Sequence, residues 1–192
     1  MPRRPRRFAD PKRFALGIGI PSTMEHWEIR TDGHLRDLAS MMAREDARRD
    51  IETMGRQADL AARSGVHVVS DLSASALPDL FADKDVVTVA AHTAKDGSIE
   101  IFDTSIDRQT FVDDIPAGFD GCLELLYCFS EPLADRIRFS KGCLVLGHAE
   151  PVGLRNASSM YLMALLTVIE RGLPYPEALF YNLDRLSRRR IQ

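Results

Sequence analysis

Two residues in the sequence stand where a thiol and an imidazole could act together. His92 follows the largely apolar stretch 85–91, and Cys128 follows a second apolar stretch, 123–127. Short apolar runs bounded by turn residues predict strands buried on both faces, as in a parallel sheet, where ligands and chemistry gather beyond the carboxyl ends of the strands. If the two strands are neighbours, His92 and Cys128 emerge at one edge. A cysteine beside a histidine is the minimum apparatus for nucleophilic catalysis by a thiol.

The residues after Cys128 favour this interpretation over that of an inert thiol. A lone cysteine in an apolar strand is usually a small buried hydrophobic residue, and we interpret Cys122 and Cys143, at the starts of expected strands, in that way. Cys128 instead precedes Phe129-Ser130-Glu131-Pro132, which predicts a strand end leading into a helix. The amino end of a helix stabilises a thiolate and offers N–H groups to an oxyanion.

Other chemistries fit the sequence less well. His148 also follows an expected strand, and it competes with His92 for the role of base or substrate contact. A metal site built from His92, His148 and Glu150 has no ligand spacing to support it, so we expect neither a metal nor another cofactor. A tyrosine-phosphatase loop requires arginine six residues after the nucleophile, where this chain has Ala134.

The elements that would position these residues alternate along the chain. We expect a strand or loop over 25–31, and Gly17 and Gly19 are better explained by close backbone packing than by a dinucleotide loop, because no third glycine follows and Pro21 interrupts. The alternation predicts an α/β sandwich, a mostly parallel sheet with helices on both faces. The expected strands are 14–20, 66–70, 85–92, 98–103 (half-exposed), 123–128 and 143–148, and the expected helices are 35–65, 73–81, 110–115, 132–139, 156–169 (a core helix) and a last one opening at Pro176.

Composition places the chain among ordinary globular proteins. It has 192 residues, 45% hydrophobic and 28% charged, with a net charge of -3. We expect a basic tail over 1–12 and one domain over 13–192, trimmed at its amino-terminal side. Three cysteines without a CxxC pair favour a reducing compartment. The apolar run 160–169 is half the ~20 residues of a membrane span, and no secretory signal opens the chain, so we expect a cytoplasmic protein without membrane partners.

Basic residues crowd both ends of the chain. Such ends can hold nucleic acid or an acidic partner, although solvated termini are the more common explanation. A nucleic-acid partner is therefore a minor alternative. The residues concerned are Arg3, Arg4, Arg6, Arg7, Lys12 and Arg13 at the start, and Arg185, Arg188, Arg189 and Arg190 at the end.

A strand leading to histidine, followed by a strand leading to cysteine, resembles the CHAT domains of the caspase-like, separase-related cysteine peptidases. The segment 75–87 is similar to the helix and strand before the catalytic histidine of that family, and 123–131 to the segment with the catalytic cysteine. The segment 143–183, with Pro-Tyr-Pro-Glu-Ala-Leu at 174–179, is similar to the closing strand and helices. The chain departs from the family at Thr93, where glycine is common, and at Phe129, where a polar residue is more usual.

The resemblance implies a caspase-like three-layer sandwich and a cysteine endopeptidase that cleaves a protein or peptide. Cys128 would attack the carbonyl and His92 would protonate the leaving amine, while Thr93, Phe129 and His148 would border the oxyanion or substrate. The pocket of this superfamily often holds an acidic residue facing a basic side chain, for which Glu25, Asp71 and Glu150 are candidates. An activator or partner protein is a further expectation. The alternative is a catalytically inactive CHAT-like protein-interaction module.

Overall fold

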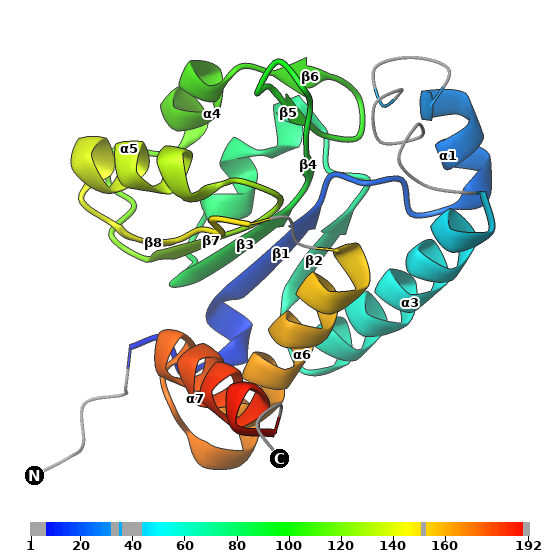
Figure 1. The fold of residues 1–192 in the computed structure, drawn as a ribbon. Helices are drawn as coiled ribbons and strands as arrows, with labels where there is room; N and C mark the ends of the chain where they lie inside the picture. Colours follow the sequence, from blue (N-terminus) through cyan, green and yellow to red (C-terminus); the bar gives the residue numbers. More distant parts are fainter. Residues whose placement is uncertain (1–6, 32–34, 36–43, 151–152, 190–192) are drawn as a thin grey trace, which may run out of the picture.

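Five parallel strands form the main sheet of the computed structural model, which describes residues 7–31, 35, 44–150 and 153–189 (Figure 1). β1, β3 and β7 are buried along almost their whole length, which explains their continuous apolar sequences. The expected parallel sheet is therefore confirmed. Its order is β2 (His67–Ser70), β1 (Phe14–Ile18), β3 (Val86–Ala90), β7 (Cys122–Leu126) and β8 (Leu144–Leu146).

Helices cover both faces of this sheet, as predicted (Figure 1). One core lies between the sheet and α1 (Met24–Thr31), α3 (Arg44–Arg63), α6 (Leu154–Arg171) and α7 (Tyr175–Arg189). The other lies under η2 (Ala74–Ala76), η3 (Pro78–Phe81), α4 (Arg108–Asp114) and α5 (Glu131–Lys141). A short turn of helix, η1 (Pro11–Arg13), leads into β1. The molecule is thus a three-layer α/β sandwich.

The direction of winding reverses between β1 and β3. The chain runs outward from β1 to β2, returns to the other side of β1 as β3, and continues through β7 to β8. In open parallel sheets, such a reversal creates a crevice beyond the carboxyl ends of the two strands. A functional site is therefore expected at the carboxyl ends of β1, β3 and the adjacent β7.

A small antiparallel sheet follows β3 directly and changes the prediction for two segments. It consists of β4 (His92–Thr93), β5 (Ile99–Glu100) and β6 (Ser105–Ile106). The expectation of one strand through His92 was wrong, because β3 ends at Ala90 and His92 belongs to the second sheet. The segment 98–103 was expected to be half-exposed, but Ile99 and Glu100 are buried because this sheet packs onto the core.

Several helices differ from the sequence-based expectation. Residues 25–31 belong to helix α1. Oγ1 of Thr23 caps this helix by accepting a hydrogen bond from the backbone N–H of His26 (3.1 Å). The expected helix over 73–81 is two short 3-10 helices. The long helix ends as predicted before Gly65, whose φ is +95°, while residues 36–43 of its expected start lie outside the described residues. α6 was expected to be a core helix, yet Leu166 and Ile169 are exposed.

The two glycines around the end of β1 are explained by close packing, as predicted. A Cβ atom on Gly17 would lie 2.7 Å from side-chain carbons of both Leu72 and Leu80. One on Gly19 would lie 3.0 Å from the Cα of Ile101. Any larger residue would therefore push the small antiparallel sheet and η3 away from β1.

Part of the amino-terminal basic group binds within the molecule. Arg13 donates to both carboxylate oxygens of Asp85, at 2.6 and 2.8 Å, and Arg7 donates to the carbonyl of Asp120 at 2.6 Å. Arg3, Arg4, Arg6 and Arg190 lie outside the described residues. Arg7 and Arg13 thus anchor the start of the chain to the loops before β3 and β7.

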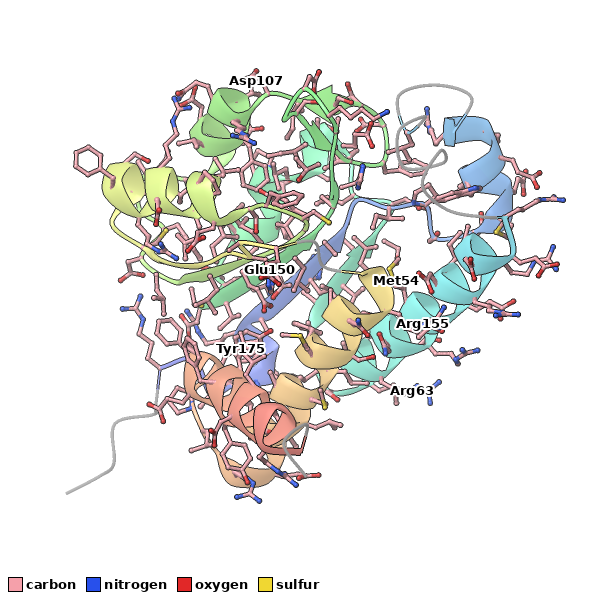
Figure 2. The ribbon with its side chains drawn as sticks, in the orientation of Figure 1. Met54, Arg63, Asp107, Glu150, Arg155 and Tyr175 are labelled. Carbon is pink, nitrogen blue, oxygen red and sulfur yellow. The ribbon has the colours of Figure 1, made fainter. Side chains whose placement is uncertain are left out.

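A carboxyl group lies in the middle of the sheet. Glu124 of β7 is fully buried and accepts hydrogen bonds from the Tyr175 hydroxyl (2.6 Å) and the Thr88 hydroxyl (3.1 Å). Tyr175 reaches it from the end of α7 that faces the sheet (Figure 2). Burial raises the pKa of Glu124 to about 7, although both hydrogen bonds oppose this shift. The group is therefore protonated in the folded protein over a pH range where it is ionised in the unfolded chain.

We expect folding stability to fall as the pH rises from about 5 to about 8, because the folded pKa lies above the unfolded one. The loss should approach about 3 kcal/mol, at about 1.4 kcal/mol per pKa unit. Glu124→Gln should remove most of this dependence, whereas Glu177→Gln on the exposed face of α7 should retain it. Urea unfolding at several pH values measures the effect, and a Glu124→Gln slope equal to that of the wild type would contradict it.

Candidate active site

The two residues singled out in the sequence lie beyond the ends of neighbouring strands. β3 and β7 pair in parallel, with their last residues, Ala90 and Leu126, in register. His92 and Cys128 each follow two residues later, so both emerge at the carboxyl edge of the main sheet. The adjacency on which the catalytic hypothesis depends is thus present.

A hydrogen bond joins the two segments directly. The hydroxyl of Thr93 donates to the carbonyl oxygen of Cys128 at 2.8 Å. This contact connects β4 to the loop after β7 and fixes the separation between the backbone next to His92 and the backbone of Cys128. The Thr93 hydroxyl thus holds the cysteine loop, a role that the sequence did not indicate for this residue.

The buried Ser130 connects the loop that contains Cys128 to two neighbouring segments by hydrogen bonds. The Ser130 hydroxyl donates to the carbonyl of Leu125 (3.0 Å) and accepts from the backbone N–H of His148 (2.9 Å). Phe129, between Cys128 and Ser130, has a φ of +54°, a left-handed conformation that costs energy for a residue with a side chain. Its side chain is 53% exposed and lies beside the cysteine. Ser130 therefore holds a strained turn between β7 and α5.

Cys128 differs from the other two cysteines in exposure. It is partly exposed, whereas Cys122 and Cys143 are buried. Burial raises the pKa of both buried thiols, which disfavours the reactive thiolate. Cys128 also lies two residues before the N-cap, Ser130, of α5, where the helix dipole favours negative charge. Among the cysteines, Cys128 is the one placed to react.

A buried carboxylate next to His92 was not identified from the sequence. His92 and Glu100 face each other across β4 and β5, and Nε2 of His92 lies 3.8 Å from Oε2 of Glu100. Both side chains are buried, so the carboxyl group restricts the space in which the imidazole ring can turn. The Asp96-Gly97 turn was a usable signal, because a hairpin around it brings 98–100 back against 92–94. The turn does not specify the register of the two strands, so the pairing of His92 with Glu100 could not be predicted from it.

His148 belongs to the same edge but is held through its backbone. Its N–H donates to Ser130, and its carbonyl accepts from the N–H of Glu131 (3.2 Å). Gly147 permits this approach, because a Cβ there would lie 2.9 Å from the Cβ of Ala134. Burial lowers the pKa of His148, so its imidazole is neutral near pH 7. The residue is placed as a neutral neighbour of the cysteine loop.

Of the three acidic residues considered for a substrate pocket, one is hydrogen-bonded within a cluster of side chains and two are exposed. The carboxylate of Asp71 accepts from the N–H and hydroxyl of Ser22 (2.7 and 2.8 Å) and lies 2.9 Å from Nδ1 of His26. This cluster closes the ends of β1 and β2. Glu25 and Glu150 are exposed. Within the described part of the chain, no group of three or more His, Cys, Asp or Glu residues is arranged to hold a metal ion.

The comparisons with known proteins do not assign the chain to a family. No family model matches the chain, and no curated protein matches it. A flavodoxin structure from Streptococcus pneumoniae TIGR4 is similar, with a TM-score of 0.35 and 14% sequence identity, over 76% of this chain and 93% of that one. Within the residues described, every helix is too short or too polar to cross a membrane.

We expect iodoacetamide to alkylate Cys128 at least about ten-fold faster than Cys122 or Cys143 in the folded protein near neutral pH, because thiolate character and exposure control the rate. His92→Ala should slow the reaction of Cys128, whereas His67→Ala, on an exposed residue of β2, should not. Peptide mapping by mass spectrometry measures each site separately. Equal rates at all three sites in native protein would contradict the assignment of Cys128.

Proposed function

We propose that the chain is a caspase-like cysteine peptidase of the CHAT type in which Cys128 is the nucleophile and His92 the general acid and base. The observation that carries this proposal is the hydrogen bond from Thr93 to the carbonyl of Cys128, which joins the ends of two adjacent parallel strands. A partly exposed thiol and a buried imidazole thereby share one edge of the sheet. The order of the two strands agrees with the resemblance seen in the sequence.

The reaction follows from the two side chains. His92 takes the thiol proton as the Cys128 sulfur adds to the substrate carbonyl, and it gives this proton to the departing amine as the C–N bond breaks, leaving a thioester. His92 then takes a proton from water as the water oxygen attacks the thioester, and it returns this proton to the departing thiolate, which releases the carboxylic acid and restores the thiol. In this proposal the positive end of the α5 dipole stabilises the oxyanion of each step.

Glu100 acts in this proposal as a positioning residue. Its carboxylate lies on the Nε2 side of His92, so Nδ1 is the nitrogen that exchanges the proton with Cys128 and substrate. In this proposal the Glu100 side chain restricts the rotation of the ring, which is the orienting role of the third member of a triad. Because both residues are buried in the small sheet, the ring is held before substrate binds.

A non-catalytic interaction module is the second candidate, and one observation favours it. Phe129 exposes half of a large apolar side chain next to Cys128, at a place where a polar residue would admit substrate more readily. An exposed aromatic residue of this kind is typical of the centre of a binding surface. Such a module would bind its partner equally well after Cys128→Ala.

The peptidase proposal is tested by peptide-library cleavage with identification of new amino termini by mass spectrometry. We expect cleavage by the wild type and by Cys143→Ala, and a loss of at least about 100-fold in Cys128→Ala and His92→Ala, because residues that act as a unit are each required. Cleavage that persists in Cys128→Ala would refute the proposal. Binding of the same peptides without cleavage, unchanged in Cys128→Ala, would establish the second candidate.

Glu100→Ala should slow alkylation of Cys128 by iodoacetamide several-fold, because the buried ring of His92 then loses the side chain that restricts its rotation. Glu100→Gln, which keeps the volume of the side chain, should recover part of the rate, and the exposed Glu150→Gln serves as the control. A rate in Glu100→Ala equal to that of the wild type would contradict the positioning role.

A further inference from the structure

The hydroxyl of Ser130 takes the place of a hydrogen bond between β7 and β8. In this parallel pair, the N–H of Leu144 donates to the carbonyl of Gly121, which precedes its partner in β7. Repeating the pattern four residues further along would join the N–H of His148 to the carbonyl of Leu125. Instead, Oγ of Ser130 accepts from the N–H of His148 (2.9 Å) and donates to the carbonyl of Leu125 (3.0 Å). The hydroxyl thus separates the two strand ends and connects them at the same time.

The side chain of Ser130 does not perform the local function that its position suggests. Ser130 is the N-cap residue of α5, where a serine hydroxyl usually accepts from a backbone N–H of the first helical turn. Its side chain makes no such capping bond. The residue is fully buried, and both partners of its hydroxyl belong to segments outside the helix. The hydroxyl therefore serves the arrangement of the strand ends and not the helix.

A turn with an unfavourable backbone conformation lies inside the loop that Ser130 closes. The hydrogen bond from Ser130 to Leu125 closes the segment 125–130, which contains Cys128 and Phe129. Phe129 has a φ of +54°, which costs energy because of its Cβ atom. A conformation of this kind persists only where the surrounding contacts impose it. Without the bond from Ser130, Phe129 is free to return to a negative φ, which would turn the adjacent Cys128.

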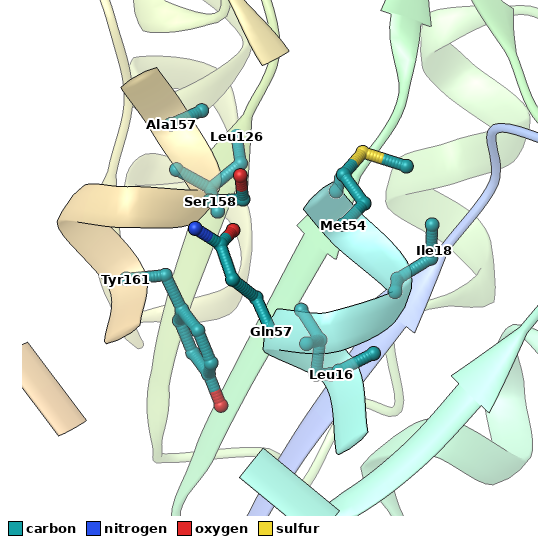
Figure 3. Close-up of a pocket in the computed structure, with 10 residues that line it drawn as sticks. Leu16, Ile18, Met54, Gln57, Leu126, Ala157, Ser158 and Tyr161 are labelled. Carbon is teal, nitrogen blue, oxygen red and sulfur yellow. The ribbon is translucent and has the colours of Figure 1, made fainter. Parts of the chain in front are cut away.

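Packing on the face of the sheet covered by α3 and α6 restrains this segment only weakly. Leu126, the last residue of β7, borders a small cavity there together with Ala90 and Ala157 (Figure 3). Side chains that border a void lack part of the contacts of a filled core. The lining of the cavity includes neither His92 nor Cys128. The loop beyond Leu126 therefore depends on its hydrogen bonds for a fixed position.

A second hydroxyl holds Cys128 from the side of β4. Thr93 donates to the carbonyl of Cys128 at 2.8 Å, and His92 is the neighbour of Thr93 in β4. Because one hydrogen bond fixes a distance but not an orientation, this contact alone leaves the peptide group of Cys128 free to rotate. The closed turn at Ser130 removes this freedom. The two hydroxyls together fix the backbone on both sides of the thiol.

We propose that Ser130 is a positioning residue for the nucleophile, which holds the thiol of Cys128 in place by closing the strained turn at Phe129. The inference rests on the proposed function, in which Cys128 is the nucleophile. Both partners of the Ser130 hydroxyl are backbone groups, so the serine acts through the course of the chain and not on the substrate. A reactive group that is displaced by about 1 Å loses much of its rate, which gives such a residue a large effect.

The first test compares Ser130→Ala with Ser140→Ala. Ser140 lies on the same helix and donates to the carbonyl of Ile137 (3.4 Å), within that helix. We expect Ser130→Ala to slow alkylation of Cys128 by iodoacetamide at least about ten-fold and to slow peptide cleavage by no less. Ser140→Ala should match the wild type. The buried Cys122 and Cys143 are internal controls, because their slow alkylation shows that a variant is folded.

Substitutions of the neighbouring residue separate backbone positioning from the mere loss of a hydroxyl. Phe129→Gly and Phe129→Ala both remove the ring, but only glycine adopts a positive φ without cost. With glycine at this position the turn no longer needs the serine, so Ser130→Ala should slow alkylation less than about three-fold, whereas with alanine the loss should remain about ten-fold. If Ser130→Ala does not fold by itself, rescue of folding by Phe129→Gly and not by Phe129→Ala is the expected result.

The failures of the two proposals are distinguishable. A rate in Ser130→Ala equal to that of the wild type, or the same loss with glycine and with alanine at residue 129, would overturn the positioning role and leave the peptidase proposal in place. If the wild type cleaves no peptide although Cys128 reacts fast and depends on Ser130, the peptidase proposal fails and the positioning of the thiol is supported. If Cys128 of the wild type reacts no faster than Cys122, both proposals fail.

Discussion

The parallel pairing of β3 with β7 determines where the residues of the candidate site lie. The register runs from Val86 opposite Cys122 to Ala90 opposite Leu126, and both strands are buried between two helical layers. A slip of one residue would exchange the two faces of a strand, which burial on both sides and the fully enclosed Glu124 oppose. The chain therefore leaves the sheet at the same level from both strands, and the later contacts adjust a proximity that the pairing has already created.

Sequence reasoning located the strands of the main sheet because strands buried on both faces leave continuous apolar runs. It placed four carboxyl ends two residues too late, since β1, β3, β7 and β8 end at residues 18, 90, 126 and 146. It found β5 within the expected strand 98–103 but missed β4, because a strand of two residues carries no periodic signal, and the partnership of His92 with Glu100 was missed with it. It also failed for α1, an eight-residue and mostly polar segment whose helical state depends on the cap at Thr23 and on Trp27, which is buried in the core.

The carboxyl edge of the main sheet is divided into two parts with different chemistry. At the ends of β1 and β2, the carboxylate of Asp71 is surrounded by Ser22 and His26, which ties the two loops together. At the ends of β3 and β7, the side chains are a partly exposed thiol and a buried imidazole. Asp71, one of the three acidic residues considered for a substrate pocket, is thus part of a structural cluster.

Hydrogen bonds of Ser130 connect the segment after the edge strand β8 to the loop that contains Cys128. β8 is the outermost strand beyond β7, and Arg138 of α5 donates to the carbonyl of Val145 within it through Nε (2.9 Å) and Nη2 (2.6 Å). The loop that leaves β8 is bound through the N–H of His148 to the same hydroxyl that holds the turn after β7. A displacement of β8 therefore reaches the strained turn at Phe129 through the Ser130 hydroxyl, so the rim of the fold and the position of Cys128 are mechanically coupled.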